Sequence, residues 1–247
     1  MILVRYNTEG LKRTTDLRDI FWRKTALLVG GSPSLREQPI ELLSQRGVLT
    51  MAINNAAVHF RPTMWVSGDR PDCYEPQILD DPTIMKFAPI SAADMEIRGK
   101  PYHRCPNIYY YMQKPNVPWD EYLEDRAEVP WYSNTMFASI HILYHLGIRR
   151  IVLCGSDFGF SKNGEMYAHE TALGSLEKKW NLDLYNHLVK ELRALKPVFD
   201  KHGLELMDSS MNSRIKDTYP HITLEEAVAM CKEGFPDQMV DPKSLPH

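Results

Sequence analysis

The chain has 247 residues, which is enough for one large α/β domain or two small ones with a substantial core. Apolar residues make up 43% of the chain and aromatic residues 10%, a composition that excludes wholesale disorder. Lys and Arg total 29 against 32 for Asp and Glu, and the resulting formal charge of -3 excludes a strongly basic nucleic-acid-binding protein.

Cysteine usage and the distribution of apolar residues indicate the compartment in which the protein is expected. The four cysteines, Cys73, Cys105, Cys154 and Cys231, form no CxxC pair, which is typical of a reducing cytosol. No apolar run approaches the ~18 residues needed to span a bilayer, and the opening MILVRYNTEG turns polar too soon for a signal peptide. The sequence therefore predicts a soluble, cytoplasmic protein without a membrane span.

Short apolar runs in the first part of the chain predict buried strands of a parallel sheet. After a polar lead-in over 1–24, they are TALLVGG (25–31), VLTMAI (48–53) and TMWVSG (63–68). Between the first two, Pro39 and the following IELLSQRG fit a helix that ends at Gly47. The region 70–130 shows only short strand-like pieces, IMKFAPI and NIYYYMQ, separated by loops.

Regular patterns return after residue 132. Ser133 or Asn134 is expected to cap a helix over TMFASIHILYHL. The run RRIVLCG (149–155) predicts another buried strand, and a long amphipathic helix is expected over 181–202. LELMDSS (204–210) predicts the last strand, and a capping box formed by Thr223 and Glu226 begins a final helix.

Strands that alternate with helices predict an α/β fold with a Rossmann-like, doubly wound, mostly parallel sheet. We interpret residues 1–247 as a single domain with a small lid at about 161–180, a loop-like segment with weak periodicity. In such sheets ligands bind in the crevice beyond the carboxyl ends of the strands. The loops after residues 30, 53, 67, 155 and 208 are therefore the candidate site.

The first of these loops reads Gly30, Gly31, Ser32, Pro33, Ser34. Two glycines allow a ligand to approach the backbone, and exposed amides with the hydroxyls of Ser32 and Ser34 can bind phosphate oxygens. The loop matches neither GxGxxG nor a P-loop, and an ordinary strand-to-helix turn is the alternative.

Polar residues also follow the other strands. Asn54 and Asn55 suit a base edge or a ribose, or a simple turn. Asp69 can hold a ribose hydroxyl or a divalent cation, or pair with Arg70. Asp157 is a second carboxylate at a strand end. Together, these strand ends predict one polar crevice.

Other reactive side chains are less suited to catalysis. His141 and His145 have metal-ligand spacing without the Glu of a zinc hydrolase, so we expect packing or surface positions. Cys154 lies within an apolar strand, where a thiol is normally inert, and no GxSxG elbow is present. His169 lies beyond a strand-end loop, where it faces either a ligand or solvent.

These motifs resemble a known superfamily. GGSPSL is similar to the G-N-G-P-S-L motif of bacterial lipooligosaccharide sialyltransferases and to the opening of 6-hydroxymethylpterin diphosphokinase-like proteins. Tyr132-Ser133-Asn134-Thr135, the block HLGIRRIVLCGSDFGF and a Tyr-Ala pair at 167–168 resemble a second block of both groups. LMDSSMNSRI resembles the last strand of the sialyltransferases, and the matched blocks lie between residue 25 and roughly 215.

The resemblance implies a nucleotide-binding domain with a nucleotide held by three groups of residues. They are Gly30, Gly31, Ser32 and Ser34; Asn54 and Asn55; and Ser133 and Asn134. The strand-end residues Asp69, Asp157 and Phe158 are further candidates for contact with the nucleotide. The resemblance also implies that Tyr167 holds the leaving phosphate, with Arg214 as a further candidate. The segment GSLEKKWNLD lacks the family's histidine base, so His169 is the candidate base.

Three hypotheses for the function follow. The first is a nucleotide-sugar-dependent glycosyltransferase that requires no cofactor and moves a sugar to a glycan, a protein or a modified nucleobase. The second is a diphosphotransferase in which Asp69 or Asp157 binds Mg²⁺. The third is a nucleotide-binding module without catalysis. Glycosyl transfer ranks first. Trp119 and Trp131 fit an acceptor groove, a homo-oligomer contact or the core.

Overall fold

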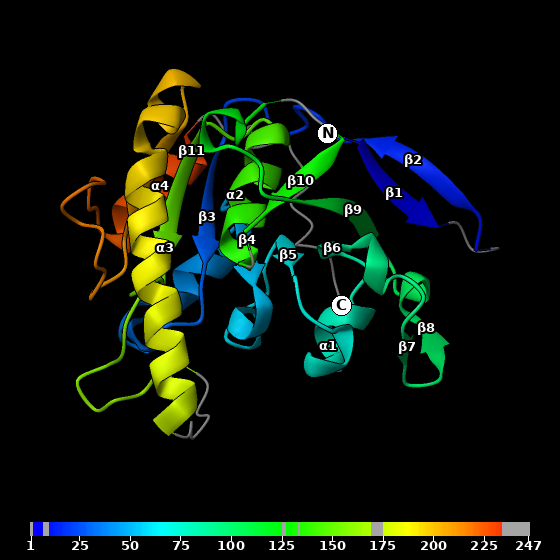
Figure 1. The fold of residues 1–247 in the computed structure, drawn as a ribbon, viewed down its shortest axis with the longest axis horizontal. Helices are drawn as coiled ribbons and strands as arrows, with labels where there is room; N and C mark the ends of the chain where they lie inside the picture. Colours follow the sequence, from blue (N-terminus) through cyan, green and yellow to red (C-terminus); the bar gives the residue numbers. More distant parts are fainter. Residues whose placement is uncertain (1, 7–9, 125–126, 133, 169–174, 234–247) are drawn as a thin grey trace.

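A computed structural model of the chain describes residues 2–6, 10–124, 127–132, 134–168 and 175–233, with only the backbone described at residue 2 and at 175–178. Its centre is a ten-stranded sheet in the order β12-β11-β3-β4-β5-β6-β9-β1-β2, with β10 paired to β9 (Figure 1). The strands of this sheet are β1 (Ile2–Tyr6), β2 (Lys12–Asp16), β3 (Thr25–Val29), β4 (Thr50–Ile53), β5 (Met64–Val66), β6 (Met85–Pro89), β9 (Ile108–Pro115), β10 (Glu128–Trp131), β11 (Arg150–Cys154) and β12 (Glu205–Asp208).

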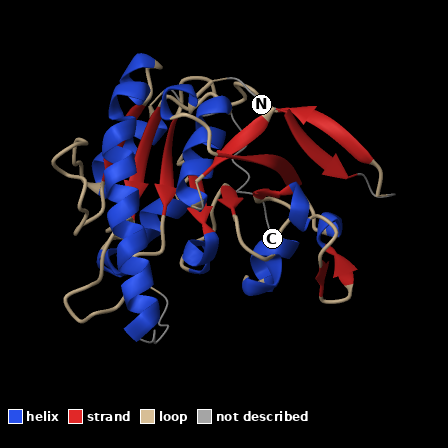
Figure 2. Cartoon of the chain, in the orientation of Figure 1, coloured by secondary structure: helices blue, strands red, loops and turns tan. Residues whose placement is uncertain are grey.

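All pairings in this sheet are parallel except those of β1 with β2 and with β9. A separate two-stranded ribbon is formed by β7 (Glu96–Ile97) and β8 (Lys100–Pro101). Helices flank the sheet, as the colouring by secondary structure in Figure 2 shows. The predicted α/β, Rossmann-like, mostly parallel architecture is therefore confirmed.

The central strands are buried on both faces, which explains their continuous apolar sequences. In β3, Ala26 and Leu28 belong to one apolar cluster, whereas Leu27 and Val29 belong to the other. This alternation follows from the two-residue period of a strand. Each face of the sheet therefore has its own core.

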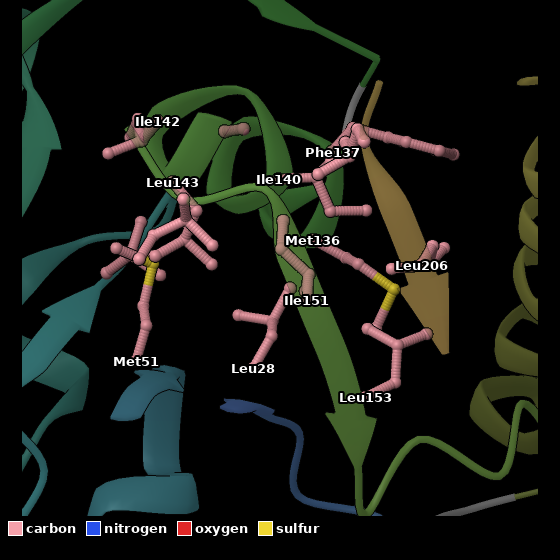
Figure 3. Packing of buried hydrophobic residues seen from close by; sticks show 14 of the residues in the cluster. Leu28, Met51, Met136, Phe137, Ile140, Ile142, Leu143, Ile151, Leu153 and Leu206 are labelled. Carbon is pink, nitrogen blue, oxygen red and sulfur yellow. The ribbon is translucent and has the colours of Figure 1, made fainter. Parts of the chain in front are cut away.

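Two helices cover the first face. They are α2 (Thr135–His145) and α3 (Ser175–Lys201). Every residue of α2 except Tyr144 is buried, as expected for a helix that is apolar on all sides. Figure 3 shows Met136, Ile140 and Leu143 of this helix in one cluster with Leu28 and Met51 of the sheet. Leu192, Leu195 and Phe199 bring α3 into the same core.

The second face is covered by α4 (Leu224–Lys232) and by short 3₁₀ helices. Thr223 and Glu226 form the predicted capping box at the start of α4. α1 (Pro76–Asp80) follows β5 along the chain. The 3₁₀ helices are Pro33–Glu37, Ile40–Ser44, Asn54–Val58, Pro71–Cys73, Ile90–Ala92, Tyr102–Arg104 and Trp119–Glu121.

Three segments differ from the expectations. The polar lead-in forms the antiparallel hairpin of β1 and β2, which projects from one edge of the sheet (Figure 1). The segment after Pro39 is a 3₁₀ helix rather than an α-helix. α3 begins at Ser175, earlier than expected, so its first turns lie within the span predicted as a lid. Within the described residues, no helix combines the length and apolarity needed to cross a bilayer.

Candidate functional site

A cavity of about 900 Å³ lies beyond the carboxyl ends of β11, β3, β4 and β5. The chain passes from β3 to β4 on one side and from β11 to β12 on the other, so the cavity lies at the switch point of the sheet. Nine residues predicted for the site line it: Gly30, Gly31, Ser32, Asn54, Asn55, Asp69, Asn134, Phe158 and Tyr167. Ser133 and His169 lie outside the described residues.

The two glycine-containing loops after β3 and β11 pack directly against each other. A Cβ atom on Gly30 would lie 2.6 Å from the carbonyl oxygen of Gly155, a backbone atom that has no room to move. The Ser32 N–H donates to the same oxygen, at 2.9 Å. Gly30 is therefore needed for close packing of these loops. At Gly31, by contrast, a Cβ atom would meet nothing within 4 Å.

Ser34 and Asp157 line no part of the cavity, although both were predicted to contact the nucleotide. Both are buried, and they bind each other: the Ser34 N–H donates to Oδ2 of Asp157 at 3.1 Å, and the Ser34 hydroxyl donates to Oδ1 at 2.5 Å. The Asp157 N–H in turn donates to Oγ of Ser32 at 3.1 Å. Asp157 therefore stabilises the first loop, and its carboxylate accepts hydrogen bonds from Ser34 instead of lining the cavity.

These bonds determine which donors of the first loop remain for a ligand. The N–H groups of Gly30, Ser32 and Ser34 are all bonded within the protein. No described residue accepts a hydrogen bond from the Gly31 N–H. The Ser32 hydroxyl accepts one bond and keeps its own hydrogen. The loop therefore offers one amide and one hydroxyl to the cavity, rather than the full set of donors of a P-loop.

The amino end of α2 faces the same cavity. Asn134 caps the helix by accepting a hydrogen bond from the Met136 N–H at 2.8 Å, as predicted for this position. Asn134, Thr135 and Met136 all line the cavity. A helix amino terminus carries partial positive charge and N–H groups without intrahelical acceptors, so it favours an anion.

A polar network joins the loops after β4 and β5. The Asn54 side-chain amide donates to Oδ2 of Asp69 at 3.3 Å, and the Tyr74 hydroxyl lies 3.2 Å from the same oxygen. The Tyr74 hydroxyl also lies 3.1 Å from Oδ1 of Asn54. Trp65 fixes the backbone at Asn54, because its indole N–H donates to the Asn54 carbonyl at 2.9 Å. Tyr74 lines the cavity and was missed by the sequence analysis.

Arg70 does not pair with Asp69, which was one of the expected alternatives. Its guanidinium instead binds Asp72, with distances of 3.1 Å from Nε to Oδ1 and 2.8 Å from Nη2 to Oδ2. The hydrogen bond from Arg70 lowers the pKa of the Asp72 carboxyl. Asp69 and Arg70 are the two charged residues among the described residues that line the cavity. The lining is therefore nearly neutral and poor in cations.

Trp119 and Trp131 lie in different surroundings. Trp131 lines the cavity and packs on Gly68, where a Cβ atom would lie 2.2 Å from its ring. Trp119 is partly buried and packs against the core, with its ring stacked on Tyr132 at a centroid separation of 3.9 Å. Gly68 therefore permits an aromatic wall next to the Asp69 loop.

Phe158 has a strained backbone at the edge of the cavity. Its φ of 55° is in the left-handed region, which is unfavourable for a bulky residue and costs roughly 1–3 kcal/mol. Arg214 donates from Nη1 to the Phe158 carbonyl at 3.0 Å and from Nη2 to Oδ1 of Asn186 at 2.8 Å. Arg214 thus holds this backbone, and it lines no part of the cavity where the phosphate was expected.

Of the span expected as a lid, residues 161–168 form a loop and 175–180 begin α3, while 169–174 lie outside the described residues. In this loop, the Ala168 N–H donates to the Gly31 carbonyl at 2.8 Å and Arg36 donates to the Tyr167 carbonyl at 3.3 Å, which fixes Tyr167 beside the first loop. The first turns of α3 form a further wall, and Figure 1 shows this helix running past the ends of β3 and β11. The wall residues of α3 are Trp180, Asn181, Leu184, Tyr185 and Leu188.

The remaining candidate groups are structural. His141 and His145 are buried, in agreement with the expected packing positions, and Nδ1 of His141 lies 2.8 Å from the Tyr122 carbonyl oxygen. Burial raises the pKa of the Cys154 thiol to about 12, so this group is not a nucleophile at neutral pH. The part of the chain that the structure describes contains no group of three or more His, Cys, Asp or Glu residues arranged for a metal.

Comparisons with known proteins give a likeness to solved structures only. No family model and no curated protein matches the chain. Among solved structures, the chain is similar to a mammalian sialyltransferase, with 13% identity and a TM-score of 0.41, covering 75% of this chain and 69% of that one. A mammalian sialyltransferase in complex with Gal-beta-1-3GalNAc-ortho-nitrophenol gives 11% identity, a TM-score of 0.40 and the same coverage.

Proposed function

We propose that the cavity binds a nucleotide-activated sugar and that the protein transfers the sugar to an acceptor hydroxyl. The observation that carries this proposal is the set of donors in the cavity. The Gly31 N–H, the Ser32 hydroxyl and the amino end of α2 all reach the same space at the switch point of the sheet. Such a set suits one phosphate group attached to a larger ligand.

The volume and lining support a ligand larger than a phosphate. A cavity of about 900 Å³ is within the usual range for small-molecule sites, roughly 300–1,000 Å³. Asn55 offers an amide to a ribose or a base. In this proposal, Tyr167 donates a hydrogen bond to the phosphate as the bond to the sugar breaks. Burial raises the pKa of the Tyr167 phenol, so the group stays protonated as a donor.

The Mg²⁺-dependent diphosphotransferase is the alternative, and two observations rank it second. Both carboxylate oxygens of Asp157 accept hydrogen bonds from Ser34. This side chain, one of the two candidate Mg²⁺ ligands, is therefore already engaged. Arg70 is the single basic side chain among the described lining residues, and it is bonded to Asp72. A triphosphate would find few cations in this cavity.

A thermal-shift screen tests the proposal, with cytidine, uridine and adenine nucleotides each assayed with and without Mg²⁺. At 100 times the dissociation constant, a ligand stabilises the folded state by about 2.7 kcal/mol. For a chain of this size, that free energy raises the Tm by roughly 5–10 °C. We expect this shift from a cytidine or uridine nucleotide without Mg²⁺. A shift from ATP that requires Mg²⁺ supports the diphosphotransferase instead, and no shift with any nucleotide contradicts nucleotide binding.

Transfer is then measured as release of the free nucleotide from the matching CMP- or UDP-sugar, in the presence and absence of a glycan acceptor. A nucleotide that binds while none of its sugars turns over supports the binding module without catalysis.

A further inference from the structure

We infer that Asp69 is the general base that removes the proton from the attacking hydroxyl. This inference rests on the proposed glycosyl transfer and deepens it, because it assigns a second chemical role within the same cavity. Asp69 is the single carboxylate among the described lining residues, and none of those residues is a histidine, glutamate or lysine. The three phenols of the lining are poorly suited, since burial raises the pKa of Tyr74, Tyr167 and Tyr185 and keeps these groups protonated.

The geometry leaves one oxygen of Asp69 available. Asn54 and Tyr74 both contact Oδ2, at 3.3 Å and 3.2 Å, while no described residue donates to Oδ1. The two partners are neutral, and the neighbouring cation, Arg70, is bonded to Asp72. Asp69 is therefore held by neutral donors alone, and both act on the same oxygen. Oδ1 can therefore accept a proton from a hydroxyl in the cavity.

The surroundings fix the carboxylate in place. The Asp69 N–H donates to Oγ of Ser67 at 3.1 Å, which closes the turn at the end of β5. Tyr74 is anchored by its ring, which packs edge-on against Trp65 at a centroid separation of 5.1 Å. Trp131 packs over Gly68, next to Asp69 in the chain. A catalytic group is most effective when its neighbours hold it in the reactive position before the substrate arrives.

The reaction step balances without a further reactant. The acceptor hydroxyl gives its proton to Oδ1 of Asp69, and its oxygen forms a bond to the anomeric carbon of the sugar. The bond between that carbon and the phosphate oxygen breaks, and its electron pair leaves with the nucleotide. The proton on Asp69 is then released to solvent. When water replaces the acceptor, the same step hydrolyses the donor, so the base can be tested without knowledge of the acceptor.

The test is the hydrolysis and transfer of the CMP- or UDP-sugar whose nucleotide gives a thermal shift, measured for wild type and Asp69→Asn. The asparagine keeps an oxygen that can accept the bonds from Asn54 and Tyr74, and it replaces Oδ1 with an amide nitrogen that cannot take a proton. We expect kcat to fall by 100-fold or more, in the range for loss of a general base, with the dissociation constant of the nucleotide within threefold of wild type. Asp94→Asn is the matched control, because that carboxylate is 84% exposed and lies outside the cavity lining.

Two readouts separate a base from a structural role. In wild type, kcat should rise with pH as the carboxyl group loses its proton, which gives the pH profile of kcat an acid limb. This acid limb should be absent in Asp69→Asn. Added formate should restore turnover to Asp69→Ala, because a small carboxylate can occupy the space left by the side chain. Retention of more than a third of wild-type kcat in Asp69→Asn, or loss of the acid limb in His169→Ala alone, overturns the inference. A wild-type protein that turns over no donor overturns the proposed function itself.

Discussion

Gly31→Val is expected to abolish nucleotide binding and to leave the fold intact. Gly31 lines the cavity, and a Cβ atom built on it meets no protein atom within 4 Å, so the fold has room for the new side chain. The valine methyl groups would occupy the space beside the Gly31 N–H, where the phosphate is proposed to bind. We expect the nucleotide affinity to fall at least 100-fold, measured by calorimetry, with the Tm of the free protein within about 3 °C of wild type.

Gly30→Val is the matched control, and here we expect a destabilised fold. Its Cβ atom would lie 2.6 Å from the Gly155 carbonyl oxygen and 2.9 Å from Oγ of Ser156. Overpacking of this kind typically costs about 1–3 kcal/mol, which lowers the Tm of a chain of this size by several degrees. Unchanged affinity in a folded Gly31→Val protein would contradict the proposed position of the phosphate.

Asp157→Ala is expected to destabilise the protein more than most single substitutions. The change removes two charge-assisted hydrogen bonds from a buried site and leaves the Ser34 N–H and hydroxyl without their acceptors. Hydrogen bonds to a charged group contribute about 1.5–3 kcal/mol each, so a loss of roughly 3 kcal/mol or more is expected. In urea denaturation, the midpoint should fall with little change in the m-value.

A double-mutant cycle with Ser34→Ala isolates the interaction. Because the two side chains bind each other, the effects of Asp157→Ala and Ser34→Ala should not add, with a coupling energy of about 1 kcal/mol or more. Simple additivity of the two substitutions would show that the Ser34–Asp157 contact does not brace the loop.

The central sheet could be predicted because its strands are buried on both faces, so that β3, β4, β5 and β11 are continuous apolar segments. The β1–β2 hairpin could not, because β2 is almost entirely exposed and its sequence KRTTD has no apolar face to produce an alternating pattern. α3 begins earlier than its sequence pattern predicts, because the first turns of this helix face a cavity and carry polar residues as well as Trp180.

The site could be predicted in part because parallel strands bring their carboxyl ends to one edge of the sheet. That rule assembled Gly31, Ser32, Asn54 and Asp69 from loops that are distant in sequence. The rule could not show that Asp157 binds Ser34, because a strand-end aspartate can face either the cavity or the neighbouring loop. Other lining residues, Tyr74, Trp131 and Tyr185, come from segments without a motif, and only tertiary packing brings them to the cavity.

A crystal structure of the protein with the nucleotide selected by thermal shift tests the central claim most directly. The account predicts that the nucleotide occupies the cavity between β11, β3, β4 and β5, with a phosphate oxygen about 3 Å from both the Gly31 nitrogen and Oγ of Ser32. A nucleotide bound elsewhere on the protein, with this cavity filled only by solvent at saturating concentration, would contradict it.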